Sequence, residues 1–204
     1  MKIAVIIGSI REGRKTPAQA KWVVKTLQAM DDDIDTETVD LKDYPMPIFN
    51  ETASPRYNPK RQINPAAQKW LDKLAEFDAY VFVTPEYNHG VPGVLKNAID
   101  YIDWQVNRKP AAVVSHGSAG GARAEVALKE ILSESRMVTM PTVSGVAMVG
   151  MSEKIDENGN LSEVEKAKPH GPQQALETLL KELVWYAEVL TTARARESEP
   201  AFTT

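Results

Sequence analysis

The sequence predicts a doubly wound α/β domain, in which helices cover both faces of a five-stranded parallel sheet. Short apolar runs rich in β-branched residues recur along the chain and alternate with helical patterns. The first run, Ile3 to Ile7, is continuously apolar, which is typical of a strand buried on both faces. The 204 residues suit one domain, which we expect over residues 1–196, with a disordered tail at 197–204.

Composition narrows the class of protein. Hydrophobic residues make up 43% and charged residues 25%, which is close to the globular average and argues against disorder. The net charge of −4 argues against nucleic acid or an anionic membrane as a partner. The chain has no cysteine, which excludes disulfides and thiolate chemistry. No apolar run approaches the roughly 20 residues that span a bilayer. We therefore expect a cytoplasmic protein.

Gly8 ends the first strand, and a helix signal follows. Thr16 fits the cap position, Pro17 the first helical position, and Gln19 the last position of a capping box. A second strand fits Ile34 to Leu41, where β-branched residues favour extended structure.

Residues 42–65 break the alternation with five prolines. The same stretch carries five large apolar residues: Tyr44, Met46, Ile48, Phe49 and Tyr57. A solvated linker would carry fewer such groups. We therefore expect a long ordered excursion that packs on another surface.

Regular elements return after the excursion. The pattern predicts a helix near Ala66 to Phe77, a strand over Ala79 to Thr84, a helix from Pro92 to about Trp104, a strand over Ala111 to Ser115 and a helix from Gly121 to Leu132. A last strand is expected within Val138 to Val149, and an exposed polar loop over Ser152 to Pro169. The C-terminal helix presents Leu176, Leu179, Leu180, Leu183, Ala187 and Leu190 on one face. Ligands of such sheets bind beyond the carboxyl ends of the strands, so the loops after strands one, three and four are the candidates.

The first of these loops, Gly8 to Thr16, fits neither of two familiar phosphate motifs. Ile10 replaces the middle glycine of the dinucleotide fingerprint, and Arg14 stands where a P-loop needs lysine. What remains is a set of hydroxyls, cations and free helix N–H groups that suits one phosphate monoester. A solvated basic turn is the other interpretation.

The second loop, Thr84 to Gly93, can lay Tyr87 and Asn88 beside a flat ligand, while its glycines allow close backbone approach. His89 fits a surface hydrogen-bonding role better than acid–base catalysis. No second histidine or carboxylate has the spacing of a metal site, so no metal is expected.

The third loop, Ser115 to Gly121, resembles a nucleophile elbow, but His116 takes the place of the first glycine. A glycine-rich turn with exposed N–H groups suits the polar edge of a planar heterocycle better. A simple strand-to-helix turn also fits.

Together the loops resemble the NAD(P)H-dependent FMN reductase family, flavodoxin-like oxidoreductases that include quinone, azo-dye and chromate reductases. The matching segments are Gly8-Ser9-Ile10-Arg11, then Pro85-Glu86-Tyr87-Asn88-His89-Gly90-Val91-Pro92-Gly93 with Leu95-Lys96-Asn97-Ala98-Ile99-Asp100, and Ser115-His116-Gly117-Ser118-Ala119-Gly120-Gly121. The resemblance covers residues 1–132.

The resemblance implies noncovalently bound FMN and NADPH or NADH as co-substrate. By position, Ser9, Arg11 and Thr16 would hold the phosphate; Pro85, Glu86, Tyr87, Asn88 and Gly90 would line the isoalloxazine; and Ser115, Gly117 and Gly120 would cover its other polar edge. Many members have Ser-Asn where this chain has Arg14-Lys15-Thr16-Pro17, and tyrosine where His116 stands. No residue is assigned as catalytic acid or base, because the cofactor carries the chemistry.

The expected function is an FMN-dependent NAD(P)H oxidoreductase that passes electrons to a small acceptor, such as a quinone, azo compound, metal oxyanion or free flavin. A flavodoxin-type electron carrier without its own substrate is the alternative. We also expect a homodimer, or a tetramer built from dimers. The large apolar groups of the excursion, with Ile99, Tyr101, Ile102 and Trp104, provide more apolar surface than one sheet-facing stripe needs. Otherwise these groups fold back onto their own domain.

Overall fold

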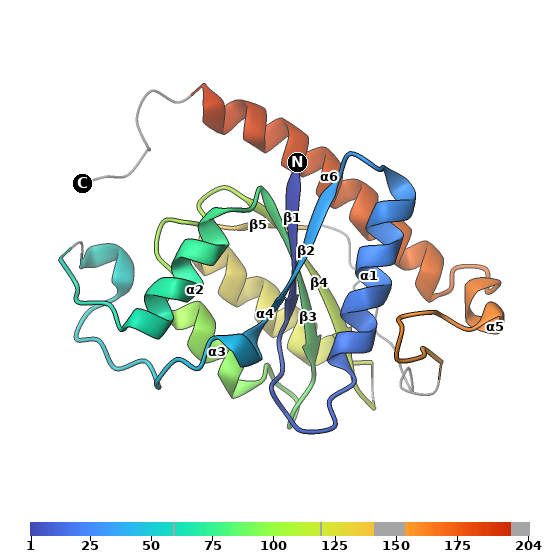
Figure 1. Ribbon diagram of the computed structural model, residues 1–204, viewed down its shortest axis with the longest axis horizontal. Coiled ribbons are helices and arrows are strands. Elements are labelled where there is room, and N and C mark those ends of the chain that lie inside the picture. The colour runs from blue at the N-terminus through green and yellow to red at the C-terminus, as the bar shows by residue number, and fades with distance from the viewer. Residues whose placement is uncertain (59, 119, 141–153, 197–204) are drawn as a thin grey trace.

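A computed structural model describes residues 1–58, 60–118, 120–140 and 154–196. Its parallel sheet has the order β2-β1-β3-β4-β5, formed by β1 (Lys2–Ile7), β2 (Asp35–Asp40), β3 (Ala79–Pro85), β4 (Pro110–His116) and β5 (Val138–Thr139) (Figure 1). The helices are α1 (Thr16–Met30), α2 (Pro65–Ala75), α3 (Gly93–Asp100), α4 (Ala122–Glu134), α5 (Glu163–Lys166) and α6 (Pro172–Ala195), with short 3₁₀ turns η1 (Leu41–Asp43) and η2 (Pro55–Tyr57). This strand order is the flavodoxin-like one, and it confirms the predicted fold class.

Helices cover both faces of the sheet (Figure 1). On one face, α1 and α6 pack over alternate residues of β1, β3 and β4. On the other face, α2, α3 and α4 pack over the intervening residues of the same strands. Every residue of β3 is buried, as expected of a strand with a helix layer on each side.

Most predicted elements agree with the structure to within two residues, but two predictions need correction. The helix from Pro92 does not reach Trp104 and ends at Asp100. The next carbonyl, that of Tyr101, accepts a hydrogen bond from Arg61 Nη2 at 2.9 Å. The polar segment expected as an exposed loop contains α5 and, among its described residues, a bridge between Ile155 and Leu161, which are both buried. The rest of the predicted last strand, from residue 141 on, and the predicted tail lie outside the described residues.

The described residues of the excursion, 42–58 and 60–65, include a stretch that packs on α3. The Asn97 side chain holds it from both ends of its amide: Oδ1 accepts from Phe49 N and Nδ2 donates to Pro47 O, each at 2.8 Å. The Phe49 and Tyr101 rings meet edge to face at 5.2 Å. Tyr44 is buried and Met46 packs on the core, so part of this apolar set does fold back onto its own domain. Ile48 and Tyr57 remain exposed.

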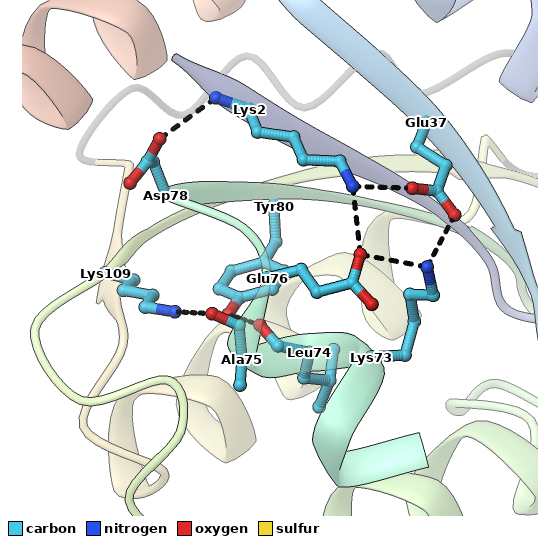
Figure 2. Close-up of polar contacts among 9 residues, drawn as sticks. All are labelled: Lys2, Glu37, Lys73, Leu74, Ala75, Glu76, Asp78, Tyr80 and Lys109. Atoms are coloured by element: carbon cyan, nitrogen blue, oxygen red, sulfur yellow. Dashed lines mark hydrogen bonds and ion pairs between the residues drawn. The ribbon is translucent and has the colours of Figure 1, made fainter. Parts of the chain in front are cut away.

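Four charged side chains form a closed ring near the amino end of the sheet (Figure 2). Lys2 Nζ lies 2.9 Å from both Glu37 and Glu76, and Lys73 Nζ lies 2.9 Å from Glu37 and 3.0 Å from Glu76. The ring links β1, β2 and the C-terminal end of α2. Each charge therefore has two partners of opposite sign.

Candidate functional site

The three loops predicted from the sequence meet at the carboxyl ends of β1, β3 and β4. Because β1 is followed by β2 on one side and pairs with β3 on the other, the chain reverses direction across the sheet at this point. A cavity of about 400 Å³ opens there. Its lining is Arg11, Glu12, Gly13, Arg14, Lys15, Thr16, Gln19, Pro85, Glu86, Tyr87, His116, Gly117 and Ser118.

The cations of the first loop have two different environments, an ion pair within the protein and the cavity. Arg14 forms a two-pronged ion pair with Asp40 at the end of β2, with Nη1–Oδ1 and Nη2–Oδ2 distances of 2.7 and 2.5 Å, and also donates to the carbonyl of Ser9. Arg11 and Lys15 are exposed at the cavity and have no carboxylate partner in the described part of the chain. These two cations are therefore available to an anion.

The start of α1 differs from the predicted capping box, which is wrong by one residue. Lys15 is the cap, Thr16 is already helical, and no side chain accepts from the first N–H groups. The Thr16 hydroxyl instead lies 3.1 Å from His116 Nε2. The start of α1 therefore has no side-chain cap beside the cavity, and the positive end of its dipole favours a bound anion there.

Gln19, predicted to close that box, has a different environment. It is 1% exposed, and neither end of its amide has a hydrogen-bond partner among the described residues. An unpaired buried amide costs about 1–3 kcal/mol. Since Gln19 lines the cavity, a ligand or water there can satisfy it.

His116, at the end of β4, is a neutral group in this setting. Burial lowers the pKa of its imidazole to about 4. At neutral pH the ring therefore contributes hydrogen bonding and not charge to the cavity floor.

The second loop turns back through two residues. Tyr87 and Gly90 exchange two backbone hydrogen bonds of 3.0 Å, and Asn88 and His89 between them have φ angles of 49° and 63°. Both positive φ angles at the centre are the mark of a type I′ turn. Asn88 and His89 are exposed at its tip and do not line the cavity.

Tyr87 and Glu86 tie this loop to its two neighbours. The Tyr87 hydroxyl lies 2.7 Å from the buried Ser9 Oγ of the first loop. The Glu86 carboxylate accepts from the backbone N–H groups of Arg123 at 3.0 Å and Ala124 at 3.3 Å, and so caps α4. Sequence reasoning missed this cap. The sequence indicates only that Gly121, at the cap position of α4, has no side-chain oxygen that could accept from the first N–H groups of the helix.

The third loop is shaped by glycine. Gly121 has a φ of 75°, and a Cβ there would lie 2.8 Å from the backbone nitrogen of His116. The Ser115 hydroxyl donates to the Gly120 carbonyl at 3.1 Å, inside the turn. Among the described residues after His116, Gly117 and Ser118 line the cavity.

The structure thus separates the sequence-predicted site residues into two groups. Six line the cavity: Arg11, Thr16, Pro85, Glu86, Tyr87 and Gly117. The other five, Ser9, Asn88, Gly90, Ser115 and Gly120, support the loops from behind or at their tips. Lys15, which the sequence analysis counted among the cations of the first loop, also lines the cavity. Sequence reasoning did not assign Gln19 or His116 to the ligand, although both line the same cavity.

The donors of the cavity fit the phosphate of FMN. Two cations without a carboxylate partner in the described residues, a helix start without a side-chain cap and a buried amide gather where a single anionic group would satisfy them. Among the described residues no three histidine, aspartate or glutamate side chains gather closely enough to hold a metal ion. No helix in the described part of the chain is long and apolar enough to cross a membrane.

A doubly wound sheet with one anion-binding loop at its switch point defines a class of proteins that bind a phosphorylated, flat cofactor. Residues 1–150 match the model of the NADPH-dependent FMN reductase family, and the chain belongs to that family. It is an FMN-dependent oxidoreductase that takes its electrons from NAD(P)H. The resemblance drawn from the three loops is confirmed, and the alternative of a simple electron carrier is not favoured.

Named relatives agree with this assignment. An NAD(P)H-dependent FMN reductase of Schizosaccharomyces pombe is 35% identical over 72% of this chain and 73% of its own. A quinone reductase of Pseudomonas putida is 30% identical over 82% of this chain and 87% of its own. Among solved structures, the flavoenzyme FerB of Paracoccus denitrificans, an NAD(P)H:(acceptor) oxidoreductase, shares the fold, with a TM-score of 0.71 and 24% identity over 92% of this chain and 97% of its own.

Proposed function

We propose that FMN binds in the cavity at the switch point with its phosphate at the start of α1. The observation that carries the proposal is the separation of cations in the first loop. Arg14 is neutralised by Asp40, whereas Arg11 and Lys15 have no carboxylate partner in the described residues and line the cavity. Ser9 and Thr16 complete the phosphate site. The Ser9 hydroxyl pairs with the Tyr87 hydroxyl and so holds the first loop against the second, and Thr16 contributes its hydroxyl.

The isoalloxazine lies between the second and third loops in this proposal. Pro85, Glu86 and Tyr87 would line one side from within the cavity, with Asn88 and Gly90 in the turn beside them, and Gly117 would lie at the other side in the turn that Ser115 and Gly120 shape. Glu86 supports this geometry, because its cap on α4 fixes the distance between the two loops. The side chains position the ring and need not react.

Bound FMN supplies a two-electron carrier that accepts hydride from nicotinamide and returns electrons to an acceptor. The protein orients the ring and keeps its phosphate end anchored. No side chain is assigned a proton-transfer role: His89 is exposed at a turn tip, and His116 is neutral and paired with Thr16. NADPH and NADH both remain candidates for the reductant.

A quinone is the acceptor that the relatives support best, since the quinone reductase of Pseudomonas putida matches over most of both chains. Azo compounds, metal oxyanions and free flavin belong to the same set of small acceptors. Use of NAD(P)H supports a cytoplasmic location, and the single sheet supports one FMN-binding domain over residues 1–196.

A homodimer, or a tetramer of dimers, is part of the proposal. Ile48 and Tyr57 of the excursion are 85% and 83% exposed, and a second subunit would cover such apolar side chains. Tyr101 and Ile102, by contrast, are buried within the chain and do not support an interface. Sedimentation of a single 22.6 kDa species at micromolar concentration would contradict the dimer.

Calorimetric titration of the flavin-free chain with FMN and with riboflavin tests the location of the cofactor. We expect FMN to bind at least tenfold more tightly, because its phosphate gains charge-assisted hydrogen bonds. Equal affinity for the two flavins would contradict the phosphate site.

Anaerobic mixing of the FMN-loaded protein with NADPH or NADH tests the activity. Bleaching of the flavin absorbance without a partner reductase is expected, and a steady-state comparison of quinones, azo dyes and free flavin then ranks the acceptors. A flavin that bleaches only when a separate reductase is added would revive the electron-carrier alternative.

A further inference from the structure

Gln19 interrupts the apolar stripe of α1. The residues that follow on its buried side, Ala20, Val23 and Leu27, are apolar and fully buried in the core between α1 and the sheet. Gln19 is as deeply buried as they are, yet it carries an amide that finds no partner among the described residues. An apolar residue would fill this position without that penalty.

The position of Gln19 on the helix directs its amide to the cavity. Side chains of an α-helix lean toward its N-terminus, so residue 19 covers the turn that contains Lys15 and Thr16. All three residues line the same cavity. Gln19 therefore lines the buried side of the cavity, one helical turn after the start of α1, and its amide is enclosed there without a partner among the described residues.

The surroundings select the ligand group that the amide can bind. The neighbouring polar groups on the floor, the Thr16 hydroxyl and the His116 imidazole, pair with each other at 3.1 Å. The rim carries the cations of Arg11 and Lys15. An anionic oxygen drawn in by the rim meets the two N–H donors of Gln19 Nε2, and the Oε1 end suits a water or hydroxyl in the same cavity.

We propose that Gln19 is a phosphate-binding residue, which donates from Nε2 to the phosphate of FMN. The inference rests on the proposed flavin site and adds a neutral donor beneath its cationic rim. The same chemistry extends to a free phosphate ion, which offers the same oxygens.

The test compares two substitutions at Gln19 with matched changes at Gln28, an exposed glutamine on the same helix. Gln19→Leu keeps the size of the side chain and removes its N–H donor. Gln19→Glu keeps the shape of the side chain and replaces the donor with a negative charge, which repels the phosphate. Quenching of flavin fluorescence gives the Kd of the full-length, flavin-free variants for FMN and riboflavin. We expect FMN affinity to fall roughly five- to thirtyfold in Gln19→Leu and about a hundredfold in Gln19→Glu, with riboflavin affinity changed by less than about threefold. Gln28→Leu and Gln28→Glu should bind both flavins as the wild type does.

Thermal unfolding of the flavin-free chains provides an independent readout. Gln19→Leu should melt at the same temperature or higher, because it removes an unpaired buried amide. Inorganic phosphate should raise the melting temperature of the wild type more than that of either Gln19 variant. An unfolded Gln19→Glu chain would leave Gln19→Leu to decide the question.

Three outcomes are informative. If the wild type does not discriminate between FMN and riboflavin, the flavin site itself is wrong. If the wild type discriminates and Gln19→Leu discriminates equally, only the role of Gln19 is wrong. If Gln19→Leu loses affinity for both flavins to the same extent, the amide contacts another part of the cofactor and the assignment to the phosphate is overturned.

Discussion

The two ends of the parallel sheet differ in whether their charged side chains have partners within the protein. Near the amino end, Lys2, Glu37, Lys73 and Glu76 pair in a closed ring, so that the charges are satisfied within the protein (Figure 2). At the carboxyl end, Arg11 and Lys15 have no carboxylate partner in the described residues, and a buried amide stands unpaired beside them. The amino end therefore satisfies its charges within the chain, whereas the carboxyl end leaves polar groups that a ligand can satisfy.

A shifted pKa alone does not distinguish these ends. Hydrogen bonds from Lys2 and then Lys73 lower the pKa of Glu37, and the same ring raises the pKa of Lys2. These shifts arise from mutual pairing on an exposed surface. The lowered pKa of His116 arises from burial without a charged partner, and it occurs in the ligand cavity. The cause of a shift is therefore more informative about function than its presence.

The largest expected effect comes from removing one cation of the carboxyl end. Arg11→Ala should weaken FMN binding tenfold to a hundredfold, because a charge-assisted contact to the phosphate is lost. Titration of the flavin-free variant measures it. Lys2→Met, which removes the same charge at the other end, is the control and should leave FMN affinity unchanged. Equal losses in the two variants would mean that overall charge and not the site attracts the cofactor.

His116 should make the flavin-free protein less stable in mild acid. The folded imidazole has a pKa of about 4 and the unfolded one about 6.5, so between these values only the unfolded chain binds the proton. Stability from this group is full above pH 6.5 and falls as pH decreases toward 4. Urea unfolding should show a loss of roughly 2 kcal/mol between pH 7 and pH 5. His116→Tyr should reduce that loss, and an unchanged loss would show that another group causes it.

Lys109 lies at the amino end of the sheet but, unlike the charges of the ring, it is not part of an ion pair in the described part of the chain. Its Nζ donates to the Ala75 carbonyl at 3.2 Å and has no carboxylate partner among the described residues (Figure 2). Burial, followed by the charge of Arg194, lowers its pKa to about 8. Between pH 8 and 10.5 the unfolded chain keeps a proton that the folded chain has released, so stability rises with pH over this window. Lys109→Met should abolish that rise and increase the unfolding free energy at pH 7 by up to about 1 kcal/mol. A clear loss of stability at pH 7 would contradict it.

The smallest effect is expected from the ring itself. Its side chains are partly exposed, and such pairs contribute little because water screens them. Glu37→Gln should lower the melting temperature only slightly, and less so in 1 M NaCl than in dilute buffer. The carboxylates of the ring are ionised above about pH 4.5, so their contribution is lost as the pH falls below that value. A large loss that persists in high salt would indicate a packing role for Glu37.

The sequence predicted the sheet and the meeting of the three loops because those features depend on local pattern. Apolar strands, the prolines before the helices and the order of elements are all visible along the chain. The pairing of Arg14 with Asp40 and of Glu86 with α4 joins residues 26 and 37 positions apart, so no local pattern predicts either contact. Gln19 shows a second limit. Its spacing from Thr16 matched a capping box, but α1 begins one residue earlier, and that shift turns the amide from a cap into part of the cavity.

The last helix has a consequence for synthesis of the chain. Leu176, Leu179, Leu180, Leu183 and Ala187 of α6 complete the core over one face of β1, β3 and β4. A ribosome delivers these residues after the described strands of the sheet, so the part of this apolar face that α6 covers stays exposed until α6 has been made. Messages truncated before residue 172 should therefore yield chains that require a chaperone or aggregate, even though the described residues that line the cavity at the switch point have already been made.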